Sequence, residues 1–518
     1  MAWLLTVAMV ASLLPSITPI AQAAYTPMPP SSAILQDSVT YEFPAETKSY
    51  TANYVITSGI ATVRIPTDAN ITVNGSAGAP FTVKNDAELI LVINGKLTVN
   101  GGEAAPNSYA GINVVSDAKL TILTEHGDGK TSGTLIATAG LCGTEDGNFA
   151  SAAGIGGNGY GDGVTAENCG TIYIGPHTNI TAIAGLSGGR GAGAGIGGGG
   201  GGNDSNGGNG GRVIIYGSVY AEGGGGDYTD GGGAGIGGGG SSGINSNAGA
   251  GGYLSIMSGA SVTTKSSQTV QPGASGGAGI GGGGTYSRDE QRGGYAGTIY
   301  IQTDTYVEAI GGNCNASTEF VGVGIGGGSG AVAGSGGTVL IERGANVVTK
   351  LGTGGTSKNF QSALGASGEF KYIGSGCGHI PADSSGILQF IDYRINIAET
   401  TLNIGTSETY YDSRKPFGGS RKESRRHAAG GGFRPAGQPA FISPPCAQRW
   451  EPGTPFSPCQ LWLFRLLGLF RSLTLSCANP CHGFPVSCVL NPPDSLFLPI
   501  KPCGGSHCSF RWDYFFVL

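Results

Sequence analysis

One five-residue string, Ala-Gly-Ile-Gly-Gly, returns along this sequence at a nearly constant interval. It stands at Ala153–Gly157, Ala194–Gly198, Ala234–Gly238 and Ala278–Gly282, and Val323–Gly327 differs from it by one residue. The central isoleucines are separated by 41, 40, 44 and 45 residues, and they are Ile155, Ile196, Ile236, Ile280 and Ile325. Such a period predicts a small unit that must stack on its neighbours, because one unit alone cannot bury an apolar face.

A second motif, Gly-x-[Ile/Val/Leu]-x-Ile, keeps step with the first. It occupies Gly170–Ile174, Gly211–Ile215, Gly252–Ile256, Gly297–Ile301 and Gly337–Ile341. A further apolar residue follows each copy after four to six positions, at Ile180, Val219, Val262, Val307 and Val347. Apolar residues alternate within these stretches, which indicates strands with one buried face. Each unit therefore reads as a strand, a short turn, a second strand and a glycine-rich corner bearing an isoleucine.

These observations predict an all-β fold, a parallel β-helix solenoid with glycine-rich repeats of about 40 residues. Neighbouring strands lie ~4.8 Å apart, so equivalent side chains form inward ladders. One ladder contains the five isoleucines above, and a second contains Ile174, Ile215, Ile256, Ile301 and Ile341. The glycines beside the first ladder permit positive φ and close stacking. Whether a repeat makes one coil or two stays open.

The ends of the repeat series are weaker. Partial copies of the string lie at Ala110–Ile112 and Ala363–Gly365. We expect strands before the series at Tyr54–Ile56, Thr62–Ile65, Leu89–Ile93 and Leu97–Val99, and after it at Ile387–Ile391, Ile395–Ile397 and Leu402–Ile404. The segments that vary in length, such as Asn203–Gly208 and Tyr286–Gly294, are expected to be loops.

Composition excludes several classes of protein. Glycine supplies 99 of the 518 residues, but no strict Gly-x-y period with abundant proline is present, so collagen is excluded. Charged residues make up 12% of the chain and the net charge is −6. This composition offers no basic face for a nucleic acid.

The domain organisation follows from these signals. Residues 1–24 read as a signal peptide, because an apolar run at Trp3–Leu14 precedes the small residues Ala21 and Ala23. The mature chain is then expected to be extracellular or in the cell wall, without a membrane span. Residues 25–110 would form the N-terminal β region and the start of the solenoid, and residues 111–411 its repeats.

Residues 412–518 do not continue the pattern. Seven of the 11 cysteines and three of the four tryptophans fall there. A zinc site built around Cys477, Cys481 and His482 is one interpretation, but no CxxC pair is present. A disulfide-linked domain is another, although seven is an odd number. We interpret the segment as aberrant, translated out of frame or disordered.

The string at Gly193–Gly200, together with the Gly-x-[Ile/Val/Leu]-x-Ile motif, resembles the glycine-rich repeats of secreted surface proteins of Gram-positive bacteria. The resemblance covers about residues 50–410. Many such proteins are described as containing carbohydrate-binding domains and are similar to the pectin-lyase-like parallel β-helix class. The resemblance implies a surface location and leaves open whether the chain is a binder, an adhesin or an enzyme.

Catalysis is not indicated by the residues. Lyases of the resembled class use several Asp ligands for calcium with an Arg or Lys base, and hydrolases need two carboxylates at a defined separation. The acids here are sparse and recur at no single phase of the repeat: Glu222, Asp227, Asp230, Asp289, Glu290, Glu308 and Glu342. We therefore expect no enzymatic activity and no cofactor. Calcium is the one ion considered, with Asp162, Asp227 and Asp230 as candidate ligands.

Tyrosines are the better candidates for binding. Alternation places Tyr173 and Tyr300 on the outer face of one strand ladder and Tyr220 and Tyr306 on the next. Further candidates lie in the glycine-rich parts at Tyr160, Tyr228 and Tyr286. Aromatic faces stack on sugar rings, although tyrosine also simply suits a strand surface.

Three functions stay open for this sequence. The first is a carbohydrate-binding or adhesin-like module whose partner is a polysaccharide or cell-surface glycan. The second is a structural stalk without a ligand. The third is a calcium-dependent polysaccharide lyase. An aligned aromatic surface would favour the first, a uniformly bland surface the second and an Asp cluster beside Lys or Arg the third.

Overall fold

The computed structural model describes residues 25–104, 107–125, 132–140, 149–225, 231–243, 245–266, 275–286, 290–314, 320–366 and 370–396, and the strands within 401–405, 473–477, 486–490 and 509–510. The chain divides into two compact units, Met1–Ala428 and Ala429–Leu518. The proposed signal peptide and most of the aberrant segment lie outside the described residues. Within those residues, no helix is long and apolar enough to cross a membrane.

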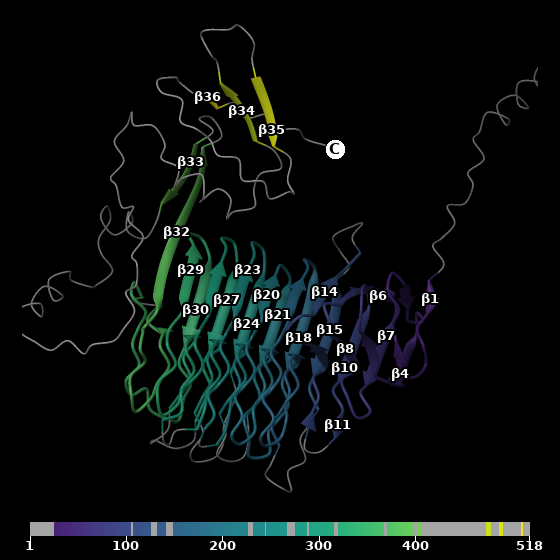
Figure 1. Ribbon diagram of the computed structural model, residues 1–518, viewed down its shortest axis with the longest axis horizontal. Coiled ribbons are helices and arrows are strands. Elements are labelled where there is room, and N and C mark those ends of the chain that lie inside the picture. Colours follow the sequence, from purple (N-terminus) through teal and green to yellow (C-terminus); the bar gives the residue numbers. More distant parts are fainter. Residues whose placement is uncertain are drawn as a thin grey trace, which may run out of the picture. The chain divides into compact units, whose positions relative to one another are not determined.

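The first unit is a parallel β-helix with three sheets (Figure 1). We call the 12-stranded sheet A, the ten-stranded sheet B and the nine-stranded sheet C. Each coil contributes one strand to sheet B, then one to sheet A, then one to sheet C, and the strands of the next coil pair with these in parallel. The all-β solenoid expected from the repeat is confirmed. The isoleucine strings are one coil apart, so each 40-residue repeat makes a single coil.

Sheet A has 12 strands: β1 (Thr26–Pro27), β3 (Thr40–Glu42), β6 (Ile60–Ile65), β9 (Glu88–Ile93), β14 (Lys119–Leu123), β17 (Thr171–Ile174), β20 (Arg212–Ile215), β23 (Tyr253–Ile256), β26 (Thr298–Ile301), β29 (Thr338–Glu342), β32 (Ile387–Asn396) and β33 (Thr401–Gly405). Its last pair, β32 and β33, is antiparallel. Two of the late strands expected from the sequence are thus one continuous strand.

Sheet C has nine strands: β4 (Thr47–Thr51), β7 (Asn70–Asn74), β10 (Lys96–Asn100), β15 (Gly133–Thr138), β18 (Thr178–Ile183), β21 (Ser218–Glu222), β24 (Ser261–Lys265), β27 (Tyr306–Ile310) and β30 (Asn346–Lys350). Sheet B has ten short strands: β2 (Ala33–Ile34), β5 (Tyr54–Ile56), β8 (Phe81–Val83), β13 (Ile112–Val114), β16 (Ile155–Gly156), β19 (Ile196–Gly197), β22 (Ile236–Gly237), β25 (Ile280–Gly281), β28 (Ile325–Gly326) and β31 (Ile373–Gly374).

Two small antiparallel groups complete the strands. β11 (Glu103–Ala104) pairs with β12 (Asn107–Ser108) in the first unit. In the second unit, β34 (Leu473–Cys477) pairs with β35 (Val486–Leu490) and β36 (Ser509–Phe510).

The inward ladders lie where the repeat predicts. The five repeat isoleucines of sheet B are stacked in register and buried, as are the isoleucines that end β17, β20, β23 and β26. Ile112 extends the sheet B ladder at one end, as the weak copy predicts. The prediction that Ala363–Gly365 continues this ladder at the other end is wrong. Ile373 pairs with Ile325 there, while Leu364 is 72% exposed.

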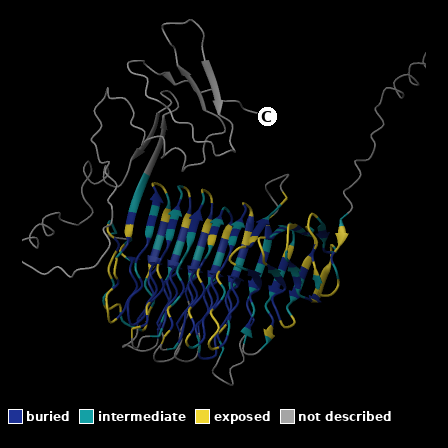
Figure 2. Ribbon diagram, viewed as in Figure 1, coloured by how far each residue is buried: buried dark blue, intermediate teal, exposed yellow. Residues whose placement is uncertain are grey.

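The expected loop at Asn203–Gly208 contains a turn at Asn203 and Asp204, but its last two glycines are buried, as are the glycine-rich segments on either side of each isoleucine. Of Tyr286–Gly294, residues 287–289 lie outside the described residues, and the two glycines at its end are buried. In each repeat the chain approaches sheet B along one segment and leaves along another, and the two pair across the isoleucine. Ala194 N donates to Gly198 O at 2.9 Å, and Gly191 N donates to Gly201 O at 2.9 Å. Ile196 therefore stands at the apex of a hairpin and points into the core, and Figure 2 shows these lower segments as largely buried.

Hydrogen bonds in these segments point in three directions in turn. Gly238 N donates to Gly281 O in the next coil, Gly239 N to Gly208 O in the preceding coil, and Gly240 N to Ala192 O on the approach segment of that coil. N–H groups that return to the same direction every third residue are typical of the polyproline II conformation, which has three residues per turn and no internal hydrogen bonds. The glycine-rich segments thus form a lattice of backbone bonded to backbone.

Glycine is required in this lattice by close approach. A Cβ on Gly239 would lie 2.0 Å from Gly199 O. Gly237, beside the apex, has φ +142°, and a Cβ there would lie 1.9 Å from Gly281 O. The structural role expected for the glycines of the string is confirmed.

Candidate binding surface on sheet A

The outer face of sheet A carries the two tyrosines predicted there. In β17 and β26 the sequence Thr-Ile-Tyr-Ile buries both isoleucines and turns the tyrosine outward. Register aligns Tyr173, Ile214, Ser255, Tyr300 and Leu340 in one row across five coils. Tyr173 and Tyr300 therefore share a face and a row, three coils apart. Ser255 is buried on this face, and its hydroxyl lies 3.2 Å from Met257 Sδ.

Two further tyrosines, missed by the sequence reasoning, fill the coils between them. Tyr216 follows β20, and its ring centroid lies 5.4 Å from that of Tyr173. Tyr253 begins β23, two residues before the predicted outward position, and the guanidinium of Arg212 lies 4.9 Å from its ring centroid. Both keep the outward phase of their strands, so extending the alternation by two residues at either end would have found them.

Four consecutive coils thus each place one tyrosine on this face. We define the sheet A aromatic surface by its members Tyr173, Ile214, Tyr216, Tyr253, Met257 and Tyr300. At ~4.8 Å per coil, its tyrosines extend over about 14 Å along the solenoid axis. All six side chains are partly exposed.

Polar groups fix parts of this surface. Tyr300 Oη donates to the carboxylate of Glu342, which is 9% exposed and also accepts a 3.0 Å hydrogen bond from Thr303 N. Burial, and then the neighbouring Tyr216, raise the pKa of Tyr173. The Tyr173 phenol thus remains neutral at physiological pH, as a hydroxyl that can donate and accept.

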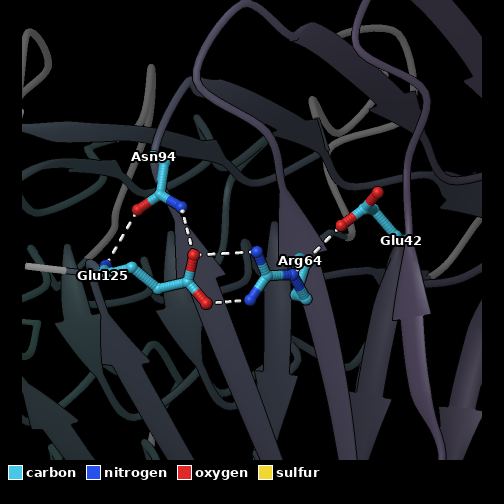
Figure 3. Close-up of polar contacts among 4 residues, drawn as sticks. All are labelled: Glu42, Arg64, Asn94 and Glu125. Carbon is cyan, nitrogen blue, oxygen red and sulfur yellow. Dashed lines mark hydrogen bonds and ion pairs between the residues drawn. The ribbon is translucent and has the colours of Figure 1, made fainter. Parts of the chain in front are cut away.

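The N-terminal part of the same sheet is a charge-paired region instead. Arg64 donates from Nε to Glu42 Oε2 at 3.1 Å and forms a bidentate ion pair with the carboxylate of Glu125 (Figure 3). Asn94 closes the group: its Nδ2 donates to Glu125 Oε2 at 3.0 Å and its Oδ1 accepts from Glu125 N at 2.8 Å. These contacts tie four coils together and leave the paired charges satisfied by one another.

The tyrosines predicted on sheet C do not form a second row. Tyr220 aligns with Thr263 and Glu308, whereas Tyr306 aligns with Ser261, two residues away in register. Tyr220 bonds to Glu222. Burial, followed by that hydrogen bond, raises the pKa of Tyr220 to about 12. Sheet C therefore separates these two side chains.

The tyrosines predicted in the glycine-rich parts are separated as well. Tyr160 is half-buried, and its hydroxyl donates to Glu167 Oε1 at 2.5 Å. Burial, and then the Glu167 carboxylate, raise its pKa. Tyr286 is partly buried beside the glycine-rich lattice, and Tyr228 lies outside the described residues.

The candidate calcium ligands are only partly described. Asp162 pairs with Arg190, with Oδ1 to Nε at 2.6 Å, and accepts from Asn203 N at 2.9 Å. Burial on its own favours the neutral acid, but the Arg190 and Asn203 hydrogen bonds outweigh it and lower the pKa of Asp162. Asp227 and Asp230 lie outside the described residues. Over the described ranges, no group of three His, Cys, Asp or Glu side chains is placed to hold a metal ion.

Comparison with known proteins gives little further information. No protein-family model and no curated protein matches this chain. Among solved structures, the chain is similar to the TibC-catalysed hyper-glycosylated TibA55-350 fragment, with 11% identity and a TM-score of 0.15, over 69% of this chain and 93% of that one. A similarity at this level supports no argument about function, which must come from the surfaces themselves.

Proposed function

We propose that this chain is a secreted, cell-surface carbohydrate-binding protein of adhesin-like type, and that the sheet A aromatic surface holds the glycan. One observation carries the proposal: four consecutive coils each present an outward tyrosine on the same face. Strand propensity alone accounts for isolated outward tyrosines such as Tyr220 and Tyr306 on sheet C. A stalk without a ligand needs no unbroken run over four coils.

The chemistry of the surface suits a sugar polymer. Tyrosine rings stack on the apolar faces of sugar rings, and their hydroxyls exchange hydrogen bonds with sugar hydroxyls. Along the solenoid axis the rings follow one another at ~4.8 Å, and Tyr216 and Tyr253 lie two residues to either side of the row that holds Tyr173 and Tyr300. The four rings therefore form a patch that is broad enough for several sugar units. Four weak contacts on one rigid sheet add up without the cost of ordering a loop.

The proposal assigns binding without a reaction. The acids of the aromatic region serve structure: Glu342 is buried against Tyr300 and Thr303. The partner is then a polysaccharide or cell-surface glycan outside the cell or in its wall. The signal peptide expected from residues 1–24 and the resemblance to glycine-rich surface proteins support this location.

The test incubates the full chain with a panel of soluble and insoluble polysaccharides, with calcium or with a chelator. Retained protein and released unsaturated or reducing ends are measured in the same tube. Retention without release, weakened by Tyr253→Ala, supports the proposal. Release of sugar ends favours a lyase or hydrolase, and the absence of both retention and release favours the stalk.

A further inference from the structure

A ladder of asparagines borders the sheet A aromatic surface on the glycine-rich side. Asn168 and Asn209 occupy equivalent positions in successive coils, three residues before β17 and β20 respectively. Asn168 Oδ1 accepts a hydrogen bond from Asn209 N at 2.8 Å, and Asn209 Oδ1 accepts one from Ala250 N at 2.8 Å. Each amide oxygen is thus used to join one coil to the next.

A second asparagine ladder begins at Asn206, three residues before Asn209 in the chain, and its amide oxygens also join one coil to the next. Asn206 Oδ1 accepts from Asn247 N at 2.7 Å, and Asn247 Oδ1 accepts from Arg292 N at 3.0 Å. All four asparagines are exposed. An asparagine side chain has one acceptor oxygen and an NH2 group with two donors. Within the described part of the chain, none of the four NH2 groups donates to a protein atom, so they present donors outward.

Arg212 continues this row of donors onto sheet A. It lies three residues after Asn209, at most about 11 Å along the backbone. Its guanidinium rests over the Tyr253 ring, and among the described residues no carboxylate pairs with it. A guanidinium held over a ring in this way keeps N–H groups available for a bidentate partner.

Glu167, which precedes Asn168 in the sequence, directs its carboxylate away from this border. The Glu167 carboxylate accepts from Tyr160 at 2.5 Å, from Asn113 Nδ2 at 2.7 Å and from Asn158 N at 3.2 Å. Its oxygens are therefore occupied on the side of the glycine-rich lattice. Next to the aromatic rings, the border thus presents the NH2 donors of the asparagines and the positive charge of Arg212.

We infer that the glycan bound at the sheet A aromatic surface is an acidic polysaccharide, whose carboxylates are held by Arg212 and the asparagine NH2 groups. The inference rests on the proposed function and narrows it. A neutral glycan offers hydroxyls, which need acceptors as well as donors, whereas a carboxylate is an acceptor only. The fork of Arg212 pairs bidentately with planar carboxylates and with tetrahedral oxyanions, and the sulfated polymers of the experiment distinguish the two.

The test uses polymers that share a backbone and differ in charge. Affinity electrophoresis of the full chain is run in hydroxyethylcellulose, carboxymethylcellulose and cellulose sulfate, and in dextran with its carboxymethyl and sulfate forms. The chain itself carries a net charge of −6, so general attraction to a polyanion is not expected. We expect retention by a carboxymethyl polymer to exceed that by its neutral parent about tenfold.

Two variants isolate the groups responsible. Asn209→Asp keeps the oxygen that accepts from Ala250 N and replaces the NH2 donors with an acceptor, so it is expected to weaken retention by the carboxymethyl polymer and leave the neutral one unchanged. Arg212→Gln is expected to remove most of the preference, and Arg212→Lys to restore only part of it. The matched controls on sheet C, Asn179→Asp and Lys265→Gln, are expected to change nothing.

The outcomes separate the two proposals. Equal retention by neutral and carboxymethyl polymers, still lost in Tyr253→Ala, overturns the inference and leaves the proposed function standing. Equal retention by sulfated and carboxymethyl polymers overturns the assignment to carboxylates. Retention by none of the polymers here or in the wider panel overturns both.

Discussion

At the scale of single residues, this protein depends on two opposite demands within one short string. Ile196 and its equivalents supply a side chain that must fill the core from the apex of a hairpin. The glycine that follows must have no side chain, because the backbone of the next coil lies against it. The string is therefore a packing unit in which neither residue type can replace the other.

The buried isoleucine ladder predicts a specific loss of stability on truncation. Ile236→Ala removes a buried side chain between two stacked isoleucines, and we expect unfolding to become easier by about 3 kcal/mol, as for other large-to-small core changes. Ile214→Ala, on the outer face of sheet A, is the matched control and should cost well under half of that. Urea titration of both variants is the measurement, and equal losses would contradict the assigned faces.

The need for glycine is tested by two positions with positive φ. Gly259 has φ +83° and nothing within 4 Å of an added Cβ, whereas Gly237 has φ +142° and a carbonyl oxygen at 1.9 Å. Gly259→Ala should cost about 1–2 kcal/mol, the usual penalty of left-handed backbone for an L-residue. Gly237→Ala should cost clearly more or prevent folding. The measurements are the soluble yield and the thermal midpoint of each variant. Equal losses in the two variants would contradict the close stacking of coils at Gly237.

Buried thiols give a third test at this scale. Burial raises the pKa of Cys169 and of Cys377 to about 12, well above the usual value near 8.5. Both remain protonated at pH 8, and only the thiolate is a good nucleophile. Iodoacetamide at pH 8 should leave both unmodified in the folded chain and modify both in denaturant, as read by peptide mass spectrometry. Rapid modification of either in the folded chain would show that its coil is open.

At the scale of elements, the glycine-rich segments act as a structural layer. Their N–H groups alternate among three neighbours, so every coil is bonded both to the coils beside it and across its own hairpin. This layer closes the side of the core that sheet B, with only two residues per strand in the repeats, cannot cover.

Hydrogen exchange tests whether the layer is real. The amides of residues 231–241 are expected to exchange about as slowly as those of β23, because both sets are hydrogen-bonded within packed coils. A solvated glycine loop would exchange at the unprotected rate within seconds. Exchange measured by mass spectrometry on peptides from each segment separates the two cases.

The sequence predicts the elements that carry side chains and misses those that do not. Alternation in Ile172–Ile174 and its equivalents predicts sheet A, and the spacing of the isoleucines predicts the register of sheet B. The packing of the glycine-rich segments could not be predicted in this way, because a residue without a side chain leaves no apolar period. Tyr216 and Tyr253 were missed since each lies two residues from the central outward position of its strand.

At the scale of the whole β-helix, stacking divides sheet A into two kinds of surface. The early coils are joined by Arg64, Glu125 and their partners, which satisfy one another. The later coils carry the tyrosines, bordered by asparagines whose oxygens join the coils. The inward residues of the repeat thus form a rigid sheet. The side chains proposed to bind the ligand occupy its outward positions, where the residue type differs from coil to coil.

The measurement that tests the binding role of sheet A most directly is a binding isotherm, on the polysaccharide that retains the protein best, for two double variants. Tyr173→Ala/Tyr253→Ala removes two rings from sheet A, and Tyr220→Ala/Tyr306→Ala removes two from sheet C. Loss of two stacking contacts is expected to weaken binding at least about tenfold in the first variant, with the second unchanged and both folded by circular dichroism. Equal affinity of both variants, or a loss confined to the sheet C variant, would contradict the assignment of sheet A as the binding surface.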